Sequence, residues 1–168
     1  HGAHIEWGTL ATSLLRRFQD NAGPRGAIFA TPESVTDLAI AILEPIRGTI
    51  YDPAAGLGMV LARAWKNRAN DDVRIVGQEV SEFSWRLGYL HLAISGAPFE
   101  IATGDTLRDD RFRGLRADRI IVCSPLAPKV DVIDVLQYAR VRAGIRGTSE
   151  VWVWAEPNLH DPSGRRVR

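Results

Sequence analysis

The stretch Asp52-Pro53-Ala54-Ala55-Gly56-Leu57-Gly58 decides the fold that the sequence predicts. A strand-like segment, residues 48–52, precedes it, and a helical pattern over residues 59–67 follows it. A glycine-rich turn between a strand and a helix lets a ligand approach the backbone closely, because glycine adopts conformations that other residues avoid. We therefore expect a ligand-binding turn at the carboxyl end of this strand.

The remainder of the chain alternates between helical and strand patterns. Further strands are predicted over residues 74–79, 99–103, 119–123 and 150–155, and further helices over residues 10–18, 31–43, 81–95 and 132–141. In the helix over 31–43, Thr31 is expected to be the N-cap and Pro32 the first helical residue. The alternation predicts an α/β fold with a doubly wound, mostly parallel sheet, in which ligands bind at the carboxyl ends of the strands.

Hydrophobic periodicity predicts which face of two helices is apolar. The expected inward positions of the helix over 31–43 are Val35, Leu38, Ala39 and Ile42. In the helix over 81–95, the apolar residues at helical spacing are Phe83, Leu87, Leu90 and Ile94. His91, in this same helix, is expected at the surface or at its boundary and not as a catalytic base.

Three of the predicted strands end in an acid or run into one, namely Asp52, Glu79 and Asp105. Glu79 lies 21 residues after Gly58, close to the offset of about 20 residues at which an acid binds ribose hydroxyls. A dinucleotide site would need a glycine at position 61, where the chain has Leu61, and Asp52 would repel a pyrophosphate. The cationic methionine end of S-adenosylmethionine would be attracted by Asp52 instead.

Residues 52–61 resemble the D-P-A-C-G-S-G-x-x-L motif of N6-adenine DNA methyltransferases, and most closely that of the modification subunits of type I restriction systems. Three further segments are similar to motifs of this family: Phe29-Ala30-Thr31-Pro32 to F-x-T-P, Gly77-Gln78-Glu79 to G-x-E, and Gly104-Asp105-Thr106-Leu107 to G-D-T-L. All four occur in the family's order within residues 26–127. The resemblance therefore implies a Rossmann-like methyltransferase fold that depends on S-adenosylmethionine.

The resemblance assigns a role to each matching position. Phe29, Thr31 and Pro32 would border the methionine portion of the cofactor, and Glu79 would bind the ribose hydroxyls. The turn around methionine and ribose would be formed by Asp52, Ala54, Gly56 and Gly58. Asp105 would accept a hydrogen bond from the adenine amine, with Leu107 packed nearby. Carboxylates suit these roles, because they accept charge-assisted hydrogen bonds from hydroxyls and amines.

The resemblance breaks at the stretch that carries catalysis. Where the family has N-P-P-F/Y, this chain has Cys123-Ser124-Pro125-Leu126. The family's asparagine accepts a hydrogen bond from the target amine, and its aromatic residue stacks on the flipped base. Cys123 is a poor acceptor and Leu126 cannot stack. We therefore expect methyl transfer to adenine N6 to be weak or lost in a domain that still binds S-adenosylmethionine.

Two alternatives stay open from the sequence. One is a non-catalytic pseudo-methyltransferase, a scaffold or regulatory module that binds DNA or a partner protein. The other is a methyltransferase for another substrate, such as a small molecule or a protein glutamine. By resemblance, the expected partners are double-stranded DNA and a specificity subunit or another subunit of the system.

Composition and length narrow the class of protein further. The 168 residues carry a net charge of +1, and residues 1–25 are expected to form a helical extension of a core at 26–168 that lacks the family's last strands. No apolar stretch reaches the roughly 18 residues that a membrane span requires. The single cysteine and the four scattered histidines have no metal-ligand spacing. A cytoplasmic protein without a metal is expected.

Overall fold

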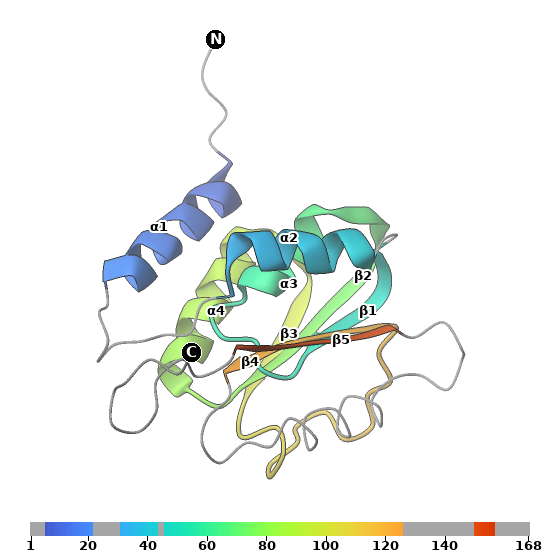
Figure 1. Ribbon diagram of the computed structural model, residues 1–168. Coiled ribbons are helices and arrows are strands. Elements are labelled where there is room, and N and C mark those ends of the chain that lie inside the picture. Colours follow the sequence, from blue (N-terminus) through green and yellow to red (C-terminus); the bar gives the residue numbers. More distant parts are fainter. Residues whose placement is uncertain (1–5, 22–30, 44–45, 126–149, 157–168) are drawn as a thin grey trace, which may run out of the picture.

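A computed structural model describes residues 6–21, 31–43, 46–125 and 150–156 of the chain (Figure 1). Its helices are α1 (Trp7–Asn21), α2 (Glu33–Ile42), α3 (Met59–Lys66) and α4 (Glu82–Ile94). Its strands are β1 (Ile46–Asp52), β2 (Arg68–Glu79), β3 (Phe99–Thr103), β4 (Arg119–Pro125) and β5 (Glu150–Glu156). All five predicted strands are confirmed, although β2 begins six residues earlier than expected.

The five strands form one parallel sheet in the order β3-β2-β1-β4-β5. The chain proceeds from β1 outward to β2 and β3, and then returns to place β4 on the opposite side of β1. Asp52 of β1 pairs with Gly77 of β2, and Tyr51 pairs with Ile120 of β4. The strand order thus reverses between β1 and β4, which is where doubly wound sheets bind their ligands. The predicted α/β fold is confirmed.

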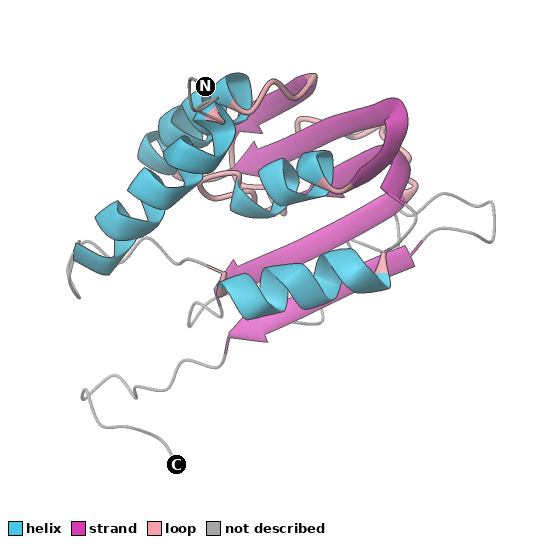
Figure 2. Cartoon of the chain, turned by 90° about the horizontal axis from the view of Figure 1, so that it is seen from above, coloured by secondary structure: helices cyan, strands magenta, loops and turns pink. Residues whose placement is uncertain are grey.

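Helices α2, α3 and α4 cover one face of the sheet, and α1 packs outside them on α4 (Figure 1). Viewed from above, α2 lies along β4 and β5, whereas α4 and α1 lie towards β3 (Figure 2). The segment between β3 and β4, residues 104–118, runs across the opposite face (Figure 1). Both faces of the central strands are therefore covered, as parallel sheets require.

Neighbouring residues of the central strands enter two separate cores. Ile50 and Ile75 pack against the helices, with Leu61 of α3 and Leu92 of α4. On the opposite face, Tyr51, Val76 and Ile120 pack against Phe112 and Ala117. The Tyr51 and Phe112 rings meet edge to face at 5.8 Å. Each fully buried side chain of this size stabilises the fold by about 1.5–3 kcal/mol, so the β1 end that carries the glycine turn is firmly fixed.

The start and the buried face of α2 differ from prediction. Pro32, not Thr31, is the N-cap, and no side chain caps this helix end. The buried residues are Thr36 and Ile40, whereas Leu38 is 61% exposed and Ile42 is 37% exposed. The inward position expected for Leu38 and Ile42 was therefore wrong, whereas Val35 and Ala39 are half-buried. Thr36 can be buried because its hydroxyl donates a hydrogen bond to the Pro32 carbonyl at 3.2 Å.

The helix α4 has the expected bounds but buries a different face. Three of its large apolar side chains are half exposed, at 49–56%, namely Phe83, Leu90 and Ile94. Its buried residues are instead small or polar, together with one leucine: Ser84, Gly88, His91 and Leu92. His91 is 1% exposed, so its expected surface position was wrong. The cause is the close approach of α4 to the glycine turn, described below.

Some predictions lie outside the described residues, including the helix over 132–141, Phe29 and Leu126. Of Ser124 and Pro125, only the strand backbone is described. Within the described ranges, no group of His, Cys, Asp and Glu side chains could hold a metal ion. No helix in these ranges is long and apolar enough to cross a membrane.

Candidate functional site

The turn between β1 and α3 depends on two glycines. Gly56 has a φ of +53° and Gly58 a φ of +70°, values that favour glycine over residues with a side chain. The Gly58 N–H donates to the Ala55 carbonyl at 2.8 Å, which closes the turn. The Ala55 N–H donates to the Gln78 carbonyl at 2.9 Å, which attaches the turn to β2. The turn therefore has one defined conformation at the carboxyl end of the sheet.

Asp52 is a buried acid at the end of β1. It is 1% exposed, and its Oδ1 accepts a hydrogen bond from the Ala54 N–H at 2.9 Å. Burial raises the pKa of Asp52 to about 7, against the lowering effect of the Ala54 hydrogen bond, and the charge of Glu79 raises it further. Asp52 therefore changes its charge near neutral pH, at the point where the strand order reverses.

Glu79, at the end of β2, joins the turn to α4. Its Oε2 accepts from the Gly56 N–H at 2.7 Å, and its Oε1 accepts from the Ser81 N–H at 2.8 Å. Ser81 is the N-cap of α4, and its hydroxyl accepts from the Ser84 N–H. The carboxylate is thereby held in one orientation beside the turn.

The loop after β3 carries the third acid. Asp105 is half buried, and its Oδ1 accepts from the Leu107 N–H at 3.0 Å, while Arg108 lies 3.7 Å from its Oδ2. The Thr106 hydroxyl donates to the Pro53 carbonyl, so this loop contacts the turn directly. The acids that follow β1, β2 and β3 thus stand at one edge of the sheet, as the sequence predicts for parallel strands.

The side-chain amide of Gln78, on β2, holds the same loop through hydrogen bonds. It is fully buried, its Nε2 donates to the Asp109 carbonyl at 2.8 Å, and its Oε1 accepts from the Arg111 N–H at 3.0 Å. A buried amide with partners at both ends holds the backbone that follows Asp105.

Cys123 of β4 completes the group around Asp52. Burial raises the pKa of the Cys123 thiol to about 12, the charge of Asp52 raises it further, and a hydrogen bond with the Thr31 side chain opposes this. The thiol is therefore protonated at neutral pH. The structure thus brings Thr31, Asp52 and Cys123 together.

Sequence reasoning missed how closely α4 approaches the turn. A Cβ atom added to Gly88 would lie 2.8 Å from the Gly56 carbonyl oxygen and 3.2 Å from the Leu57 carbonyl carbon. One turn further along α4, His91 contacts the same turn. A signal was available, because Ser84, Gly88 and His91 recur at helical spacing and are all small or polar.

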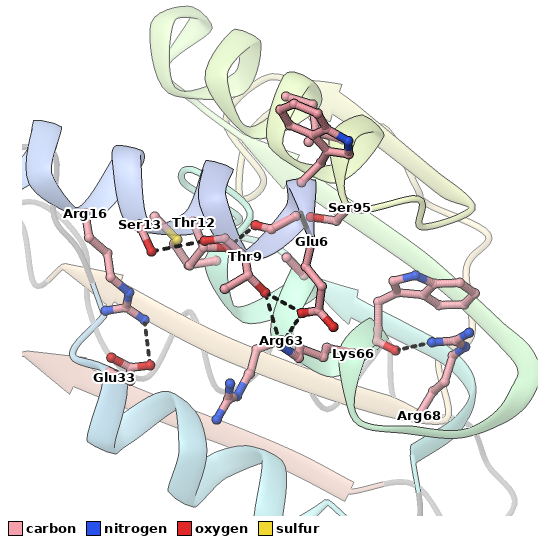
Figure 3. A pocket seen from close by; sticks show the side chains of 16 residues that line it. Glu6, Thr9, Thr12, Ser13, Arg16, Glu33, Arg63, Lys66, Arg68 and Ser95 are labelled. Carbon is pink, nitrogen blue, oxygen red and sulfur yellow. Dashed lines mark hydrogen bonds and ion pairs between the residues drawn. The ribbon is translucent and has the colours of Figure 1, made fainter. Parts of the chain in front are cut away.

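A separate hollow of about 510 Å³ lies between α1 and α3 (Figure 3). Each of its four basic side chains already has an acidic partner: Arg16 with Glu33, Arg63 with Asp37, Lys66 with Glu6 and Arg68 with Asp71. This internal pairing leaves little charge for a ligand. The edge of the sheet with its three acids is the stronger candidate site.

The strand order, the glycine turn after β1 and the acid after each of the first three strands define the Rossmann-like fold of S-adenosylmethionine-dependent methyltransferases. The family model of the N-6 DNA methylases matches residues 7–133. The chain belongs to this family.

Its relatives include methylase subunits of type I restriction enzymes. It is 29% identical over 130 residues to the MjaIX methylase subunit of Methanocaldococcus jannaschii, covering 74% of this chain and 23% of the relative. It is 32% identical over 104 residues to the HindI methylase subunit of Haemophilus influenzae, covering 59% and 24%. The chain thus spans about a quarter of the length of these relatives.

A solved structure shares the fold. The methyltransferase subunit of a type I restriction-modification system from Streptococcus thermophilus superposes with a TM-score of 0.62 at 23% identity. The match covers 69% of this chain and 27% of that one.

Proposed function

We propose that this domain binds S-adenosylmethionine at the glycine turn and that its methyl transfer to adenine N6 in DNA is weak or lost. A single observation carries the proposal. The buried Asp52 lies beside the Gly56–Gly58 turn, and near it on β4, where the family has its catalytic motif, stands a protonated Cys123. We assign residues 1–25 to a helical extension and residues 26–168 to the methyltransferase-like core.

The turn has the space and the chemistry that the cofactor needs. Among the described residues, a Cβ atom at Gly56 would meet only the Ala54 carbonyl oxygen, at 3.9 Å, so none of them fills this side of the turn. Each Glu79 oxygen accepts one backbone N–H and retains a second lone pair for a ribose hydroxyl. Asp52 in its charged form attracts a cationic sulfonium. When bound, S-adenosylmethionine supplies an activated methyl group.

The remaining assignments follow the family motifs. Phe29, Thr31 and Pro32 border the methionine portion, with Ala54 in the turn beside it. Asp105 accepts from the adenine amine of the cofactor, and Leu107 packs against that ring. Leu107 is 41% exposed, which leaves an apolar surface for a ring to cover.

Catalysis is the part of the function that the site supports least. Methyl transfer to an exocyclic amine needs hydrogen-bond acceptors at the end of β4 to orient the amine. The Cys123 thiol is protonated, and sulfur is a weak acceptor. We therefore assign the domain to cofactor binding with little turnover.

The first experiment is calorimetric titration with S-adenosylmethionine and S-adenosylhomocysteine. We compare the wild-type chain with Asp52→Asn, which keeps an acceptor for the Ala54 N–H, and use the exposed Asp20→Asn on α1 as control. The expected wild-type Kd is on the order of micromolar, weakened about tenfold or more in Asp52→Asn and unchanged in the control. Absence of wild-type binding at millimolar ligand would overturn the proposal.

The second candidate function is a non-catalytic scaffold or regulatory module that binds double-stranded DNA or a partner subunit. The protonated Cys123 favours it as well. Gel-shift or pull-down measurements with Asp52→Ala and Glu79→Ala separate the two candidates. Partner binding that survives both substitutions while cofactor binding is absent supports the scaffold, and coupled loss of both supports the cofactor-dependent domain.

A further inference from the structure

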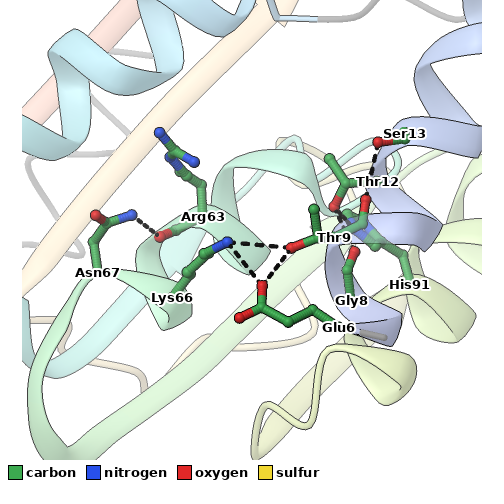
Figure 4. Close-up of polar contacts among 9 residues, drawn as sticks. All are labelled: Glu6, Gly8, Thr9, Thr12, Ser13, Arg63, Lys66, Asn67 and His91. Atoms are coloured by element: carbon green, nitrogen blue, oxygen red, sulfur yellow. Dashed lines mark hydrogen bonds and ion pairs between the residues drawn. The ribbon is translucent and has the colours of Figure 1, made fainter. Parts of the chain in front are cut away.

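His91 links three parts of the molecule from the buried face of α4. Its Nδ1 lies 2.9 Å from the carbonyl oxygen of Leu57 in the glycine turn. Its Nε2 lies 2.8 Å from the hydroxyl oxygen of Thr12 on α1 (Figure 4). A histidine that is 1% exposed therefore has a partner at each ring nitrogen, one in the candidate site and one on the outer helix.

The partners define where the ring proton lies. A carbonyl oxygen can only accept, so Nδ1 carries the proton and donates it to Leu57. Burial lowers the pKa of His91, so the ring is neutral, and Nε2 accepts from the Thr12 hydroxyl. That hydroxyl also lies 2.9 Å from the Gly8 carbonyl, and its one proton serves either acceptor. The His91 ring thus donates a hydrogen bond to the Leu57 carbonyl and accepts one from the Thr12 hydroxyl.

The Leu57 carbonyl belongs to the peptide that joins Leu57 to Gly58, in the turn whose two glycines have a positive φ. The same peptide unit contains the Gly58 N–H, which donates to the Ala55 carbonyl at 2.8 Å. His91 therefore holds the oxygen end of a peptide plane whose nitrogen end is held within the turn. Gly58 on one side of this plane resists its rotation only weakly, so the hydrogen bonds at its two ends, to Ala55 and to His91, hold its orientation.

Gly88 allows α4 to lie close enough to the turn for the His91 ring to form its hydrogen bond with Leu57. Its missing side chain allows the α4 backbone to approach the Gly56 carbonyl, and His91 follows three residues later on the same face. The two residues of α4 thus have different roles: Gly88 allows the helix backbone to lie close to the turn, and His91 forms a directed hydrogen bond with it.

We propose that His91 is a positioning residue of the cofactor site: it holds the Leu57 carbonyl so that the glycine turn keeps its ligand-binding shape, and its other ring nitrogen separately holds α1 through Thr12. The consequence for cofactor affinity rests on the function proposed above, whereas the effect on the turn does not.

A second contact of α1 offers a matched control. Lys66 of α3 lies 3.4 Å from Glu6 and 3.2 Å from the Thr9 hydroxyl (Figure 4). Both charged side chains of this pair are more than half exposed. Exposed ion pairs of this kind contribute little, so Lys66→Met should disturb only the edge of α1.

The test uses two amide substitutions that separate the ring nitrogens. In His91→Asn the short side chain can place an N–H donor near the Nδ1 position and no longer reaches Thr12. In His91→Gln the longer side chain reaches the Nε2 position and leaves the Leu57 carbonyl without its donor. Amide hydrogen exchange is followed for residues 54–60 of the turn and residues 7–14 of α1, with S-adenosylhomocysteine affinity measured alongside.

A crossed pattern is expected. His91→Gln should speed exchange in the turn and weaken cofactor binding, each by about tenfold, while α1 stays close to wild type. His91→Asn should speed exchange in α1 by about tenfold and leave the turn within about threefold of wild type. Thr12→Val should behave like His91→Asn, and Lys66→Met should alter neither segment by more than about threefold.

Other outcomes separate the two proposals. If both amide variants loosen the turn and α1 equally, His91 only fills space and the positioning role is overturned. If the crossed pattern appears but the wild-type chain binds no cofactor, His91 positions the turn and the proposed function fails. If the wild-type chain binds and the pattern is absent, the function stands without this role for His91.

Discussion

The Glu79 carboxylate accepts the Gly56 backbone N–H at 2.7 Å, so the acid assigned to the ribose also holds the turn that surrounds the cofactor. Its other oxygen accepts the Ser81 N–H at the start of α4. One side chain therefore connects β2, the glycine turn and α4. A substitution at Glu79 should change stability and affinity together, because the same two oxygens serve both.

Glu79→Gln tests this double role. The amide keeps one oxygen but directs an NH2 group at either the Gly56 or the Ser81 N–H, which leaves a donor facing a donor. We expect a loss of about 1–3 kcal/mol in the free energy of unfolding, measured in urea, and weaker S-adenosylhomocysteine binding. Glu82→Gln is the control, because Glu82 is an exposed partner of Arg86 and should change stability by about 0.5 kcal/mol or less. Equal effects of the two substitutions would contradict the assignment.

Asp52 predicts a pH-dependent affinity for the charged cofactor. Its pKa of about 7 means that the carboxyl loses its proton as the pH rises through neutrality. S-adenosylmethionine carries a positive sulfonium, so its affinity should rise several-fold between about pH 6 and pH 8. S-adenosylhomocysteine lacks that charge and should show a flatter profile. In Asp52→Asn both profiles should be flat, and an unchanged slope in this variant would place the titrating group elsewhere.

The same carboxyl predicts how stability depends on pH. The folded pKa of about 7 lies above the ordinary value of 3.8, so between these values the folded chain holds a proton that the unfolded chain has released. Asp52 therefore makes the fold less stable as the pH rises from about 4 to about 7, with no further change above that range. Asp52→Asn should be more stable than wild type at about pH 8, by on the order of 4 kcal/mol, and should lose the advantage near pH 4. Urea unfolding at both pH values checks the sign.

Gly88→Ala tests the close approach of α4 to the turn. The new methyl group would lie 2.8 Å from the Gly56 oxygen and 3.2 Å from the Leu57 carbonyl carbon, and both atoms belong to the backbone. We expect a destabilisation of about 1–3 kcal/mol and a loss of cofactor binding, because the helix or the turn must shift. Gly114→Ala is the control, since no atom in the described part of the chain lies within 4 Å of its Cβ position. A stable Gly88→Ala variant with normal cofactor affinity would show that α4 and the turn can move apart to accommodate a methyl group.

The sequence predicted the strands and the acids at their ends better than the faces of the helices. The segment 99–103 and the turn at residues 53–58 are set by local pattern, and both lie where they were expected. Periodicity failed on α4, because its inner face holds Gly88 and His91 beside Leu92, while Phe83, Leu90 and Ile94 are half exposed. Such a face depends on how near another backbone comes, and that distance arises only from the tertiary fold. His91 was misplaced for the same reason.

Cys123→Asn tests why catalysis is expected to be weak. The substitution places a side-chain carbonyl acceptor at the end of β4, in the position of the first residue of the family's catalytic motif. With double-stranded DNA rich in adenine and tritiated S-adenosylmethionine, we expect transfer near background for wild type. Cys123→Asn should raise it by about tenfold or more, since one well-placed hydrogen bond in an active site is worth at least that factor.

Two further variants make this last experiment decisive. Cys123→Ser keeps a small polar group without a carbonyl acceptor and should stay near background. Cys123→Asn combined with Asp52→Asn should return to background, because the acceptor is then present without the acid beside the turn. Robust turnover by the wild-type chain would contradict the proposed loss of activity directly. Background activity in Cys123→Asn, with cofactor affinity intact, would locate the defect beyond Cys123 and favour the scaffold function.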